Sequence, residues 1–192
     1  KLKVPGVHMR CNTMNAALVL AIMGVEPAFI ESTLGQWTGI PHRLQFFHTW
    51  QSPSGTKFRF FNDSCSTVPE AAAVASQSFG KQVVFITGGT DKGLDFMPLA
   101  ATLNYKDSFS TKVYKLYLLD GTGTEKLVQL LKKDQIDFDK PFDSLELLLK
   151  KLKEDLLMAG DSFLSDTIVF SPGATSFGMF ANEFDRGNKF MN

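Results

Sequence analysis

The chain has 192 residues, of which 44% are hydrophobic and 21% are charged. This length and balance are typical of one full domain with part of another. Twenty Lys and Arg residues offset twenty Asp and Glu residues, so no net charge draws the chain to nucleic acid or to an acidic membrane, and we expect neither as a partner. No apolar run is long enough to span a membrane, and no signal-peptide pattern is seen.

The cysteine content favours a reducing compartment. Cys11 and Cys65 are too few and too far apart for a disulfide framework or a metal site. We therefore expect a cytoplasmic protein.

The first forty residues read as two helices and a hinge. The chain begins at Lys1 without an initiator Met and runs straight into an apolar helical pattern, so we interpret it as a fragment of a longer polypeptide. Residues 15–23 predict a strong helix with Gly24 as its C-cap. Pro27 then opens a second helix over about 28–36, and residues 38–41 are typical of a hinge.

Beyond the hinge the pattern changes to alternating strands and helices. Residues 43–50 and 56–61 predict two strands joined by a turn at 52–55. We then expect strands at 82–86, 115–119 and 167–170, and helices at 69–78, 96–103, 125–133, 144–158 and after Ser176. This alternation predicts an α/β fold, with a mostly parallel sheet covered by helices on both faces.

Three loops are predicted to meet at one edge of this sheet. Right-handed crossovers place the strand-end loops 62–67, 88–93 and 171–176 along the edge where such sheets bind ligands. The last of these loops is rich in small residues, and we expect the helix after Ser176 to begin there. The unpaired amides and dipole of a helix N-terminus attract anions, so the pattern predicts a carboxylate or phosphate at this loop.

Each local pattern also has a plain structural interpretation. The loop 88–93 fits an ordinary strand-to-helix turn, and it lacks the spacing of a P-loop. Residues 62–64 are typical of a turn or a helix cap. His8 and Asn12 lie four residues apart on one helix face, where a lone His is usually packed rather than catalytic. Cys65 has no evident activating base, so we treat it as non-catalytic.

Five short motifs occur in a fixed order along the chain. Together they indicate a protein family more specifically than any single motif does. They are Gly6-x-His8-x3-Asn12; Thr38-Gly39-x-Pro41-His42-Arg43; Asn62-Asp63-Ser64-x-x-Thr67; Gly88-Gly89-x-Asp91-Lys92-Gly93-x-Asp95-Phe96; and Ser171-Pro-Gly-Ala-x-Ser176-Phe177 with Asn182-Glu-Phe-Asp-Arg186-Gly187. This ordered set resembles the Mur ligases over essentially the whole chain, and within them the branch that adds D-glutamate.

The resemblance implies a domain organisation. Mur ligases have an N-terminal domain for the UDP-sugar, a central ATPase domain and a C-terminal Rossmann-like domain. Residues 1–38 would be the last helices of the central domain. Residues 39–192 would be the complete C-terminal Rossmann-like domain.

The resemblance also implies a reaction of peptidoglycan precursor synthesis. ATP phosphorylates the terminal carboxylate of UDP-N-acetylmuramoyl-L-alanine, and the amine of D-glutamate attacks the acyl phosphate to give an amide, ADP and phosphate. ATP and Mg²⁺ would be bound mainly by the central domain, in the remainder of the polypeptide. We therefore assign no catalytic residue and no metal ligand to this chain, and expect it to be inactive alone, supplying half of a site that domain closure completes.

Site residues follow from the same resemblance. Those near the nucleotide would be Asn12, Arg43 and Asp63, with His8 and Ser64 as further candidates. Those holding the D-glutamate carboxylates would be Thr67, Lys92 and Ser176, with Phe177 and Phe184 packed beside them. A lysine with two hydroxyls suits a dicarboxylate. Arg186 is interpreted as structural.

The chain departs from the family pattern at two positions. Cys65 stands where the family often has Lys, and Met9 where Asn commonly follows the His. Two alternatives remain open: a related amide ligase that uses another amine, or a non-catalytic binding module that keeps the fold. Lys92 in its glycine-rich loop favours D-glutamate, whereas Cys65 gives some weight to the module.

Overall fold

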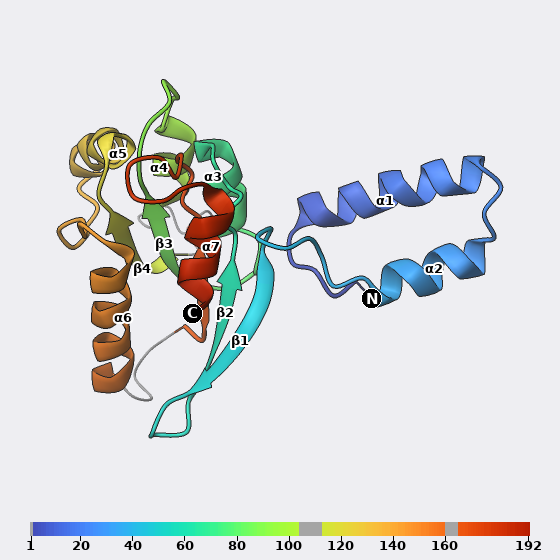
Figure 1. Cartoon of the computed structure of the whole chain (residues 1–192), viewed down its shortest axis with the longest axis horizontal. Coiled ribbons are helices and arrows are strands. Elements are labelled where there is room, and N and C mark those ends of the chain that lie inside the picture. Colours follow the sequence, from blue (N-terminus) through green and yellow to red (C-terminus); the bar gives the residue numbers. More distant parts are fainter. Residues whose placement is uncertain (1, 104–112, 160–164) are drawn as a thin grey trace.

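The computed structural model describes residues 2–103, 113–159 and 165–192. Its strands form one sheet in the order β1-β2-β5-β3-β4 (Figure 1). Their bounds are Gln45–Gln51 (β1), Lys57–Asn62 (β2), Val83–Gly88 (β3), Val113–Leu119 (β4) and Thr167–Phe170 (β5). Only β1 and β2 pair antiparallel, while β2–β5, β5–β3 and β3–β4 are parallel. The predicted mostly parallel sheet is confirmed.

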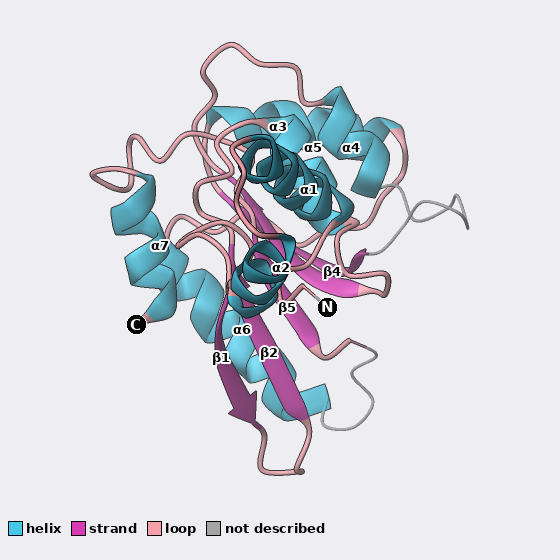
Figure 2. Cartoon of the chain, turned by 90° about the vertical axis from the view of Figure 1, so that its right-hand side faces the viewer, coloured by secondary structure: helices cyan, strands magenta, loops and turns pink. Residues whose placement is uncertain are grey.

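Helices cover both faces of the sheet, also as predicted (Figure 2). One face carries α3 (Pro69–Ser76), α4 (Met97–Leu103) and α5 (Thr122–Lys133), and the other carries α6 (Leu145–Ala159) and α7 (Glu183–Met191). Alternate residues of β3 supply the two cores: Val83 and Phe85 enter one, and Val84 and Ile86 the other. A strand that is buried on both faces consists of a continuous run of apolar residues, and this run allowed β3 to be predicted at residues 82–86.

Two further helices form a hairpin that projects from the sheet (Figure 1). These are α1 (Val7–Ile22) and α2 (Pro27–Gln36), which contact each other. Pro27 occupies the first turn of α2, as predicted. The C-cap of α1 is Met23 rather than the predicted Gly24, which follows it with a φ of 82°. α1 starts upstream of the predicted 15–23, so it includes His8. No helix in the described parts of the chain is long and apolar enough to span a membrane.

The hinge between hairpin and sheet is a constrained loop. His42 and Leu44 adopt φ values of 60° and 43°, in the left-handed region that non-glycine residues rarely adopt. Hydrogen bonds hold both: the His42 amide donates to Gln45 Oε1 (2.9 Å) and the Leu44 amide donates to Asp63 Oδ1 (3.0 Å). The strained backbone is therefore fixed by its surroundings.

The start of α7 differs from the prediction. The chain turns at residues 177–180, where Gly178 has a φ of 98°, and α7 begins only at Glu183. Asn182 caps the helix by accepting from the Asp185 amide (2.8 Å), and Asp185 accepts from the Ala181 amide (3.0 Å). The predicted helix start after Ser176 is wrong, because the helix begins further along and is capped by its own acidic and amide side chains. The carboxylate or phosphate expected at loop 171–176 stays a prediction, without a helix N-terminus to support it.

Candidate functional site

Loops 62–67 and 171–176 leave the carboxyl ends of the neighbouring strands β2 and β5 and bond to each other. The Asp63 amide donates to Phe170 O (2.8 Å), and the Gly173 amide donates to Ser66 O (2.9 Å). Ser171 Oγ adds a bond to Asp63 Oδ2 (2.6 Å). Backbone groups thus fix one loop against the other.

The loop 88–93, after β3, joins the same cluster. The Gly88 amide donates to Pro172 O (2.9 Å), and the Thr175 amide donates to Thr90 O (2.9 Å). All three predicted loops therefore meet at one edge of the sheet, because β2, β5 and β3 are adjacent and parallel.

Arg186 of α7 fastens two of these loops together. Its side chain is fully buried, and its guanidinium donates to Ser64 Oγ (3.0 Å), Ser64 O (2.8 Å) and Ala174 O (3.0 Å). Burial lowers the pKa of Arg186 to about 10, so the guanidinium stays charged at neutral pH. The structural role inferred for Arg186 agrees with these contacts.

The residues predicted to hold D-glutamate sit one on each loop. Lys92 is exposed, Thr67 is half-buried and Ser176 is buried. Among the residues that the structure describes, no hydrogen bond or ion pair engages the Lys92 ammonium or the hydroxyls of Thr67 and Ser176. The three predicted residues thus offer one cation and two hydroxyls that are chemically available, and their part in binding remains a prediction.

The two predicted aromatic neighbours lie on the surface. Phe177 and Phe184 are 67% and 52% exposed. Phe177 follows the Ser176 loop and its carbonyl accepts from Thr90 Oγ1 (2.6 Å), whereas the Phe184 ring meets His42 edge-on at 5.5 Å. Phe184 therefore faces the hinge.

The residues predicted near the nucleotide line one cavity. A pocket of about 320 Å³ between the hairpin and the sheet is lined by all three of them together with His8; the others are Met9, Trp37, Ile40, Leu44, Ala71, Val74 and Ala75. Asn12 and His8 come from α1, Arg43 from the hinge and Asp63 from the loop after β2. A mainly apolar lining with a few polar side chains fits a planar ring bearing hydroxyl or phosphate groups.

Asp63 is the most perturbed carboxyl group at this site. It is 5% exposed, and burial raises its pKa to about 6 despite hydrogen bonds from Ser171 and Leu44 and the nearby Arg43 charge. Ser64, a further candidate, is buried, and its hydroxyl donates to Glu183 O (2.7 Å) while accepting from Arg186. Its hydroxyl is therefore committed within the protein.

Burial also affects the other titratable candidates. It lowers the pKa of His8, whose Nδ1 is buried without a hydrogen-bond partner in the described structure, so the ring is neutral at pH 7. It raises the pKa of the Cys65 thiol, which makes a thiolate nucleophile unfavourable. No cluster of three or more acidic, His or Cys side chains suited to a metal occurs among the described residues, so we derive no metal-dependent step here.

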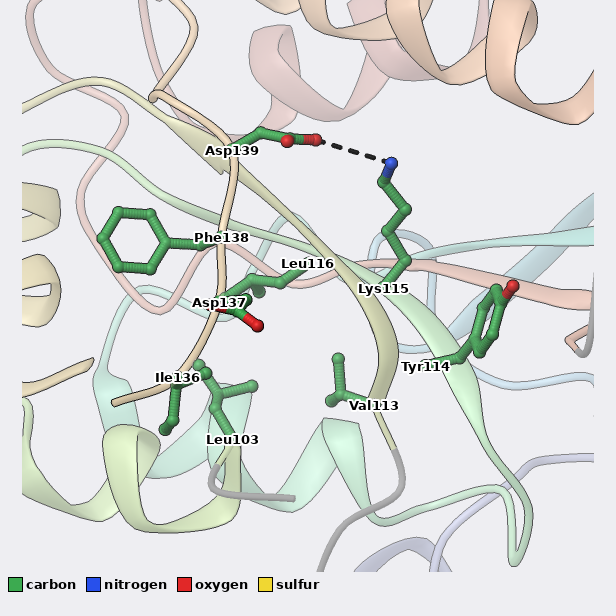
Figure 3. Close-up of a pocket in the computed structure, with 9 residues that line it drawn as sticks. All are labelled: Leu103, Val113, Tyr114, Lys115, Leu116, Ile136, Asp137, Phe138 and Asp139. Carbon is green, nitrogen blue, oxygen red and sulfur yellow. Dashed lines mark ion pairs between the residues drawn. The ribbon is translucent and has the colours of Figure 1, made fainter. Parts of the chain in front are cut away.

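A second cavity of about 330 Å³ lies at the amino end of β4 (Figure 3). Its lining includes Leu103 and Val113, the described residues on either side of 104–112, and Lys115, which pairs with Asp139 at 3.5 Å. This cavity is far along the strand from the three loops, which leave the carboxyl ends. We assign no ligand to it.

The sequence did not predict the polar contacts that join the hinge, β2 and α7 next to the site. Asn62 Nδ2 donates to His42 Nδ1 (2.9 Å) and to Gly187 O (3.2 Å), linking hinge, β2 and α7. Gly187 is required there, because a Cβ atom would overlap the His42 ring. The adjacent Arg186 and Gly187 were the available signal, but their partners Ser64 and Asn62 lie 122 and 125 positions upstream.

No protein-family model matches the chain. Curated protein sequences, however, do match the chain. The chain is 45% identical over 161 residues to the UDP-N-acetylmuramoylalanine--D-glutamate ligase of Treponema pallidum, covering 84% of this chain and 27% of the relative. It is 32% and 33% identical to the ligases of that name from Roseiflexus sp. and Aquifex aeolicus, covering 98% of this chain and 37% and 41% of theirs. The chain thus spans between about a quarter and two fifths of the length of these relatives.

A solved structure supports the fold. The UDP-N-acetylmuramate-alanine ligase MurC of Thermotoga maritima matches 98% of this chain and 38% of its own with a TM-score of 0.62 and 16% identity. That likeness concerns the fold, whereas the curated relatives share the sequence. The chain is thus similar to Mur ligases in sequence over most of its own length, and in fold.

Proposed function

We propose that this chain is part of an ATP-dependent ligase that joins D-glutamate to UDP-N-acetylmuramoyl-L-alanine in cytoplasmic peptidoglycan precursor synthesis. The observation that carries the proposal is the convergence of loops 62–67, 88–93 and 171–176, each with an unengaged polar group suited to a dicarboxylate. The 45% identity to a relative of this name supports it.

The proposal divides the chain into two parts with different roles. We assign residues 1–38 to the end of a central ATP-binding domain and residues 39–192 to a Rossmann-like C-terminal domain, since the hairpin projects from the sheet (Figure 1). ATP would lie in the cavity between them, with Asn12, Arg43 and Asp63 near its ring, ribose and phosphates. Mg²⁺ and the phosphate loop would come from the remainder of the polypeptide.

In this proposal the chain positions the nucleophile. The Lys92 ammonium would pair with a D-glutamate carboxylate, and the hydroxyls of Thr67 and Ser176 would donate to the carboxylate oxygens. Two carboxylates held at fixed points orient the amine for attack on the acyl phosphate, which is where such enzymes gain rate. Closure of the domains would bring the two substrates together.

The test uses the ligase polypeptide that contains this chain. Phosphate release from ATP should require both UDP-N-acetylmuramoyl-L-alanine and D-glutamate, and Lys92→Ala should lower kcat/KM for D-glutamate by about a hundredfold, as loss of a charge-assisted contact predicts. Lys133→Ala, at the far end of α5, is the matched control. The 192-residue chain alone should release no phosphate. Turnover by Lys92→Ala at the wild-type rate would contradict the assignment.

Two alternatives have distinct outcomes in the same assay. A diamino acid replacing D-glutamate as the preferred amine would indicate a related amide ligase. D-Glutamate binding measured by calorimetry without any phosphate release by the complete polypeptide would indicate a non-catalytic module.

A further inference from the structure

The loop that carries Lys92 is held from both sides. On one side the Thr175 amide donates to Thr90 O (2.9 Å), and Thr90 Oγ1 donates to Phe177 O (2.6 Å). On the other side lies the first turn of α5. The loop is therefore clamped between the chain after β5 and a helix that follows β4.

The α5 side of the clamp consists of contacts from the first two turns of the helix. The Gly89 amide donates to Thr124 Oγ1 (2.9 Å), and the Asp91 amide donates to Thr122 Oγ1 (3.0 Å). One turn later, Lys126 Nζ forms an ion pair with Asp91 Oδ2. The other carboxylate oxygen of Asp91 accepts from the Leu94 amide (2.9 Å).

These contacts fix the residues on both sides of Lys92. The Asp91 side chain is only 11% exposed, although Lys92 next to it is exposed. The Lys126 charge also neutralises a carboxylate that would otherwise stand beside the one cation of this loop. A free Asp91 carboxylate would compete for the Lys92 ammonium and repel an incoming dicarboxylate.

We propose that Lys126 is a positioning residue for the amine substrate, acting through Asp91 to present Lys92 and to remove the opposing negative charge. The inference rests on the proposed function, because it concerns the D-glutamate site. It adds to that function a residue from a helix that carries none of the family motifs.

The first experiment separates substrate binding from turnover. In the complete ligase polypeptide, Lys126→Met should raise KM for D-glutamate about fivefold, the upper range for a partly exposed ion pair. The value of kcat and the KM for ATP should stay within about twofold. Lys126→Arg keeps the ion pair and should restore the wild-type KM, whereas Lys133→Met on the same helix should change nothing.

A second variant guards against misfolding. Asp91→Asn keeps an oxygen for the Leu94 amide but loses the ion pair with Lys126, so it should raise KM for D-glutamate. The rise should be smaller than in Lys126→Met, because Asp91→Asn also removes the negative charge that opposes the dicarboxylate. Thermal unfolding of each variant reports whether the fold is retained. An unchanged KM in a folded Asp91→Asn or Lys126→Met protein would overturn the proposal.

A double-mutant cycle tests whether Lys126 acts through Lys92. If it does, Lys126→Met should lower kcat/KM for D-glutamate about fivefold in the wild type but by less than twofold in Lys92→Ala. Equal effects in both backgrounds would overturn the inference while leaving the proposed function intact. Absence of D-glutamate-dependent phosphate release in the wild type would instead remove the proposed function itself.

Discussion

At the scale of single residues, Asp63 combines two demands that oppose each other. Its carboxylate accepts from the Leu44 amide and the Ser171 hydroxyl, so it holds the hinge and the loop after β5 to β2. Its burial nevertheless disfavours the charged form and raises its pKa to about 6. The residue therefore organises the site at a cost in stability that depends on pH.

The sign of this dependence is fixed by the direction of the shift. Because the folded-state pKa is above the ordinary 3.8, the folded state binds the proton more tightly, and stability falls as the pH rises from about 4 to about 6. The difference corresponds to about 3 kcal/mol. The Asp63→Asn side chain cannot ionise, so the stability of the variant should not fall over this range. The free energy of unfolding of the variant minus that of the wild type should therefore increase by up to about 3 kcal/mol between pH 4 and pH 8.

Urea unfolding of both proteins at pH 4, 6 and 8 measures this difference. Asp137, whose side chain is exposed, gives the matched Asp→Asn control. Parallel stability curves for wild type and Asp63→Asn would show that the carboxyl group is not destabilised by burial.

At the scale of elements, two helices contain glycine for different reasons. In α7, Gly187 lies against the His42 ring and its carbonyl accepts from Asn62, so the helix approaches β2 and the hinge closely. In α2, Gly35 has no atom within 4 Å of where a Cβ would lie. The first glycine is demanded by packing and the second is not.

These helices therefore predict opposite effects of one substitution. Gly187→Ala should lower the free energy of unfolding by about 2 kcal/mol, because His42 is buried and held by hydrogen bonds and cannot give way without loss. Gly35→Ala should raise it by up to about 1 kcal/mol through helix propensity. Chemical denaturation of both variants provides the comparison, and a stabilised Gly187→Ala protein would contradict the packing described here.

At the scale of the whole molecule, the hairpin differs from the sheet. Its helices leave many large apolar side chains uncovered, including Val7, Met14, Leu18, Ile22 and Phe29, each at least 60% exposed. The sheet, by contrast, is enclosed by two cores. In the proposed domain organisation, the rest of the central domain would cover this surface.

The uncovered hairpin makes the 192-residue chain prone to associate. Sedimentation at micromolar concentration should detect self-association, because contiguous apolar patches of this kind favour it. Leu18→Glu with Ile22→Glu should reduce both association and binding of an apolar dye. Leu147→Glu, an exposed leucine on α6, should have a smaller effect. A wild-type chain that stays monomeric and binds no dye would contradict this prediction.

The sequence predicted more of the architecture than of the contacts. Strand positions and helix coverage were accessible because buried parallel strands form short apolar runs between glycine-rich loops. The start of α7 was not, since Ser176 and Asn182 are both suitable N-caps, and the turn between them depends on Thr90 and Gly178. The pairing of Asp91 with Lys126 spans 35 positions, and a single sequence carries no record of which charges meet.

The contacts of Arg186 have a consequence for biosynthesis. Ser64 precedes its guanidinium partner by 122 positions, so the bend after β2 lacks this anchor while the ribosome is still translating the segment between them, and only the contacts to the hinge can hold it. A polypeptide released before α7 is made would keep its glycine-rich turns but would lack the hydrogen bonds from Arg186 to Ser64 and Ala174. The bonds of Arg186 that join these two loops can therefore form only after the last helix of the chain has been synthesised.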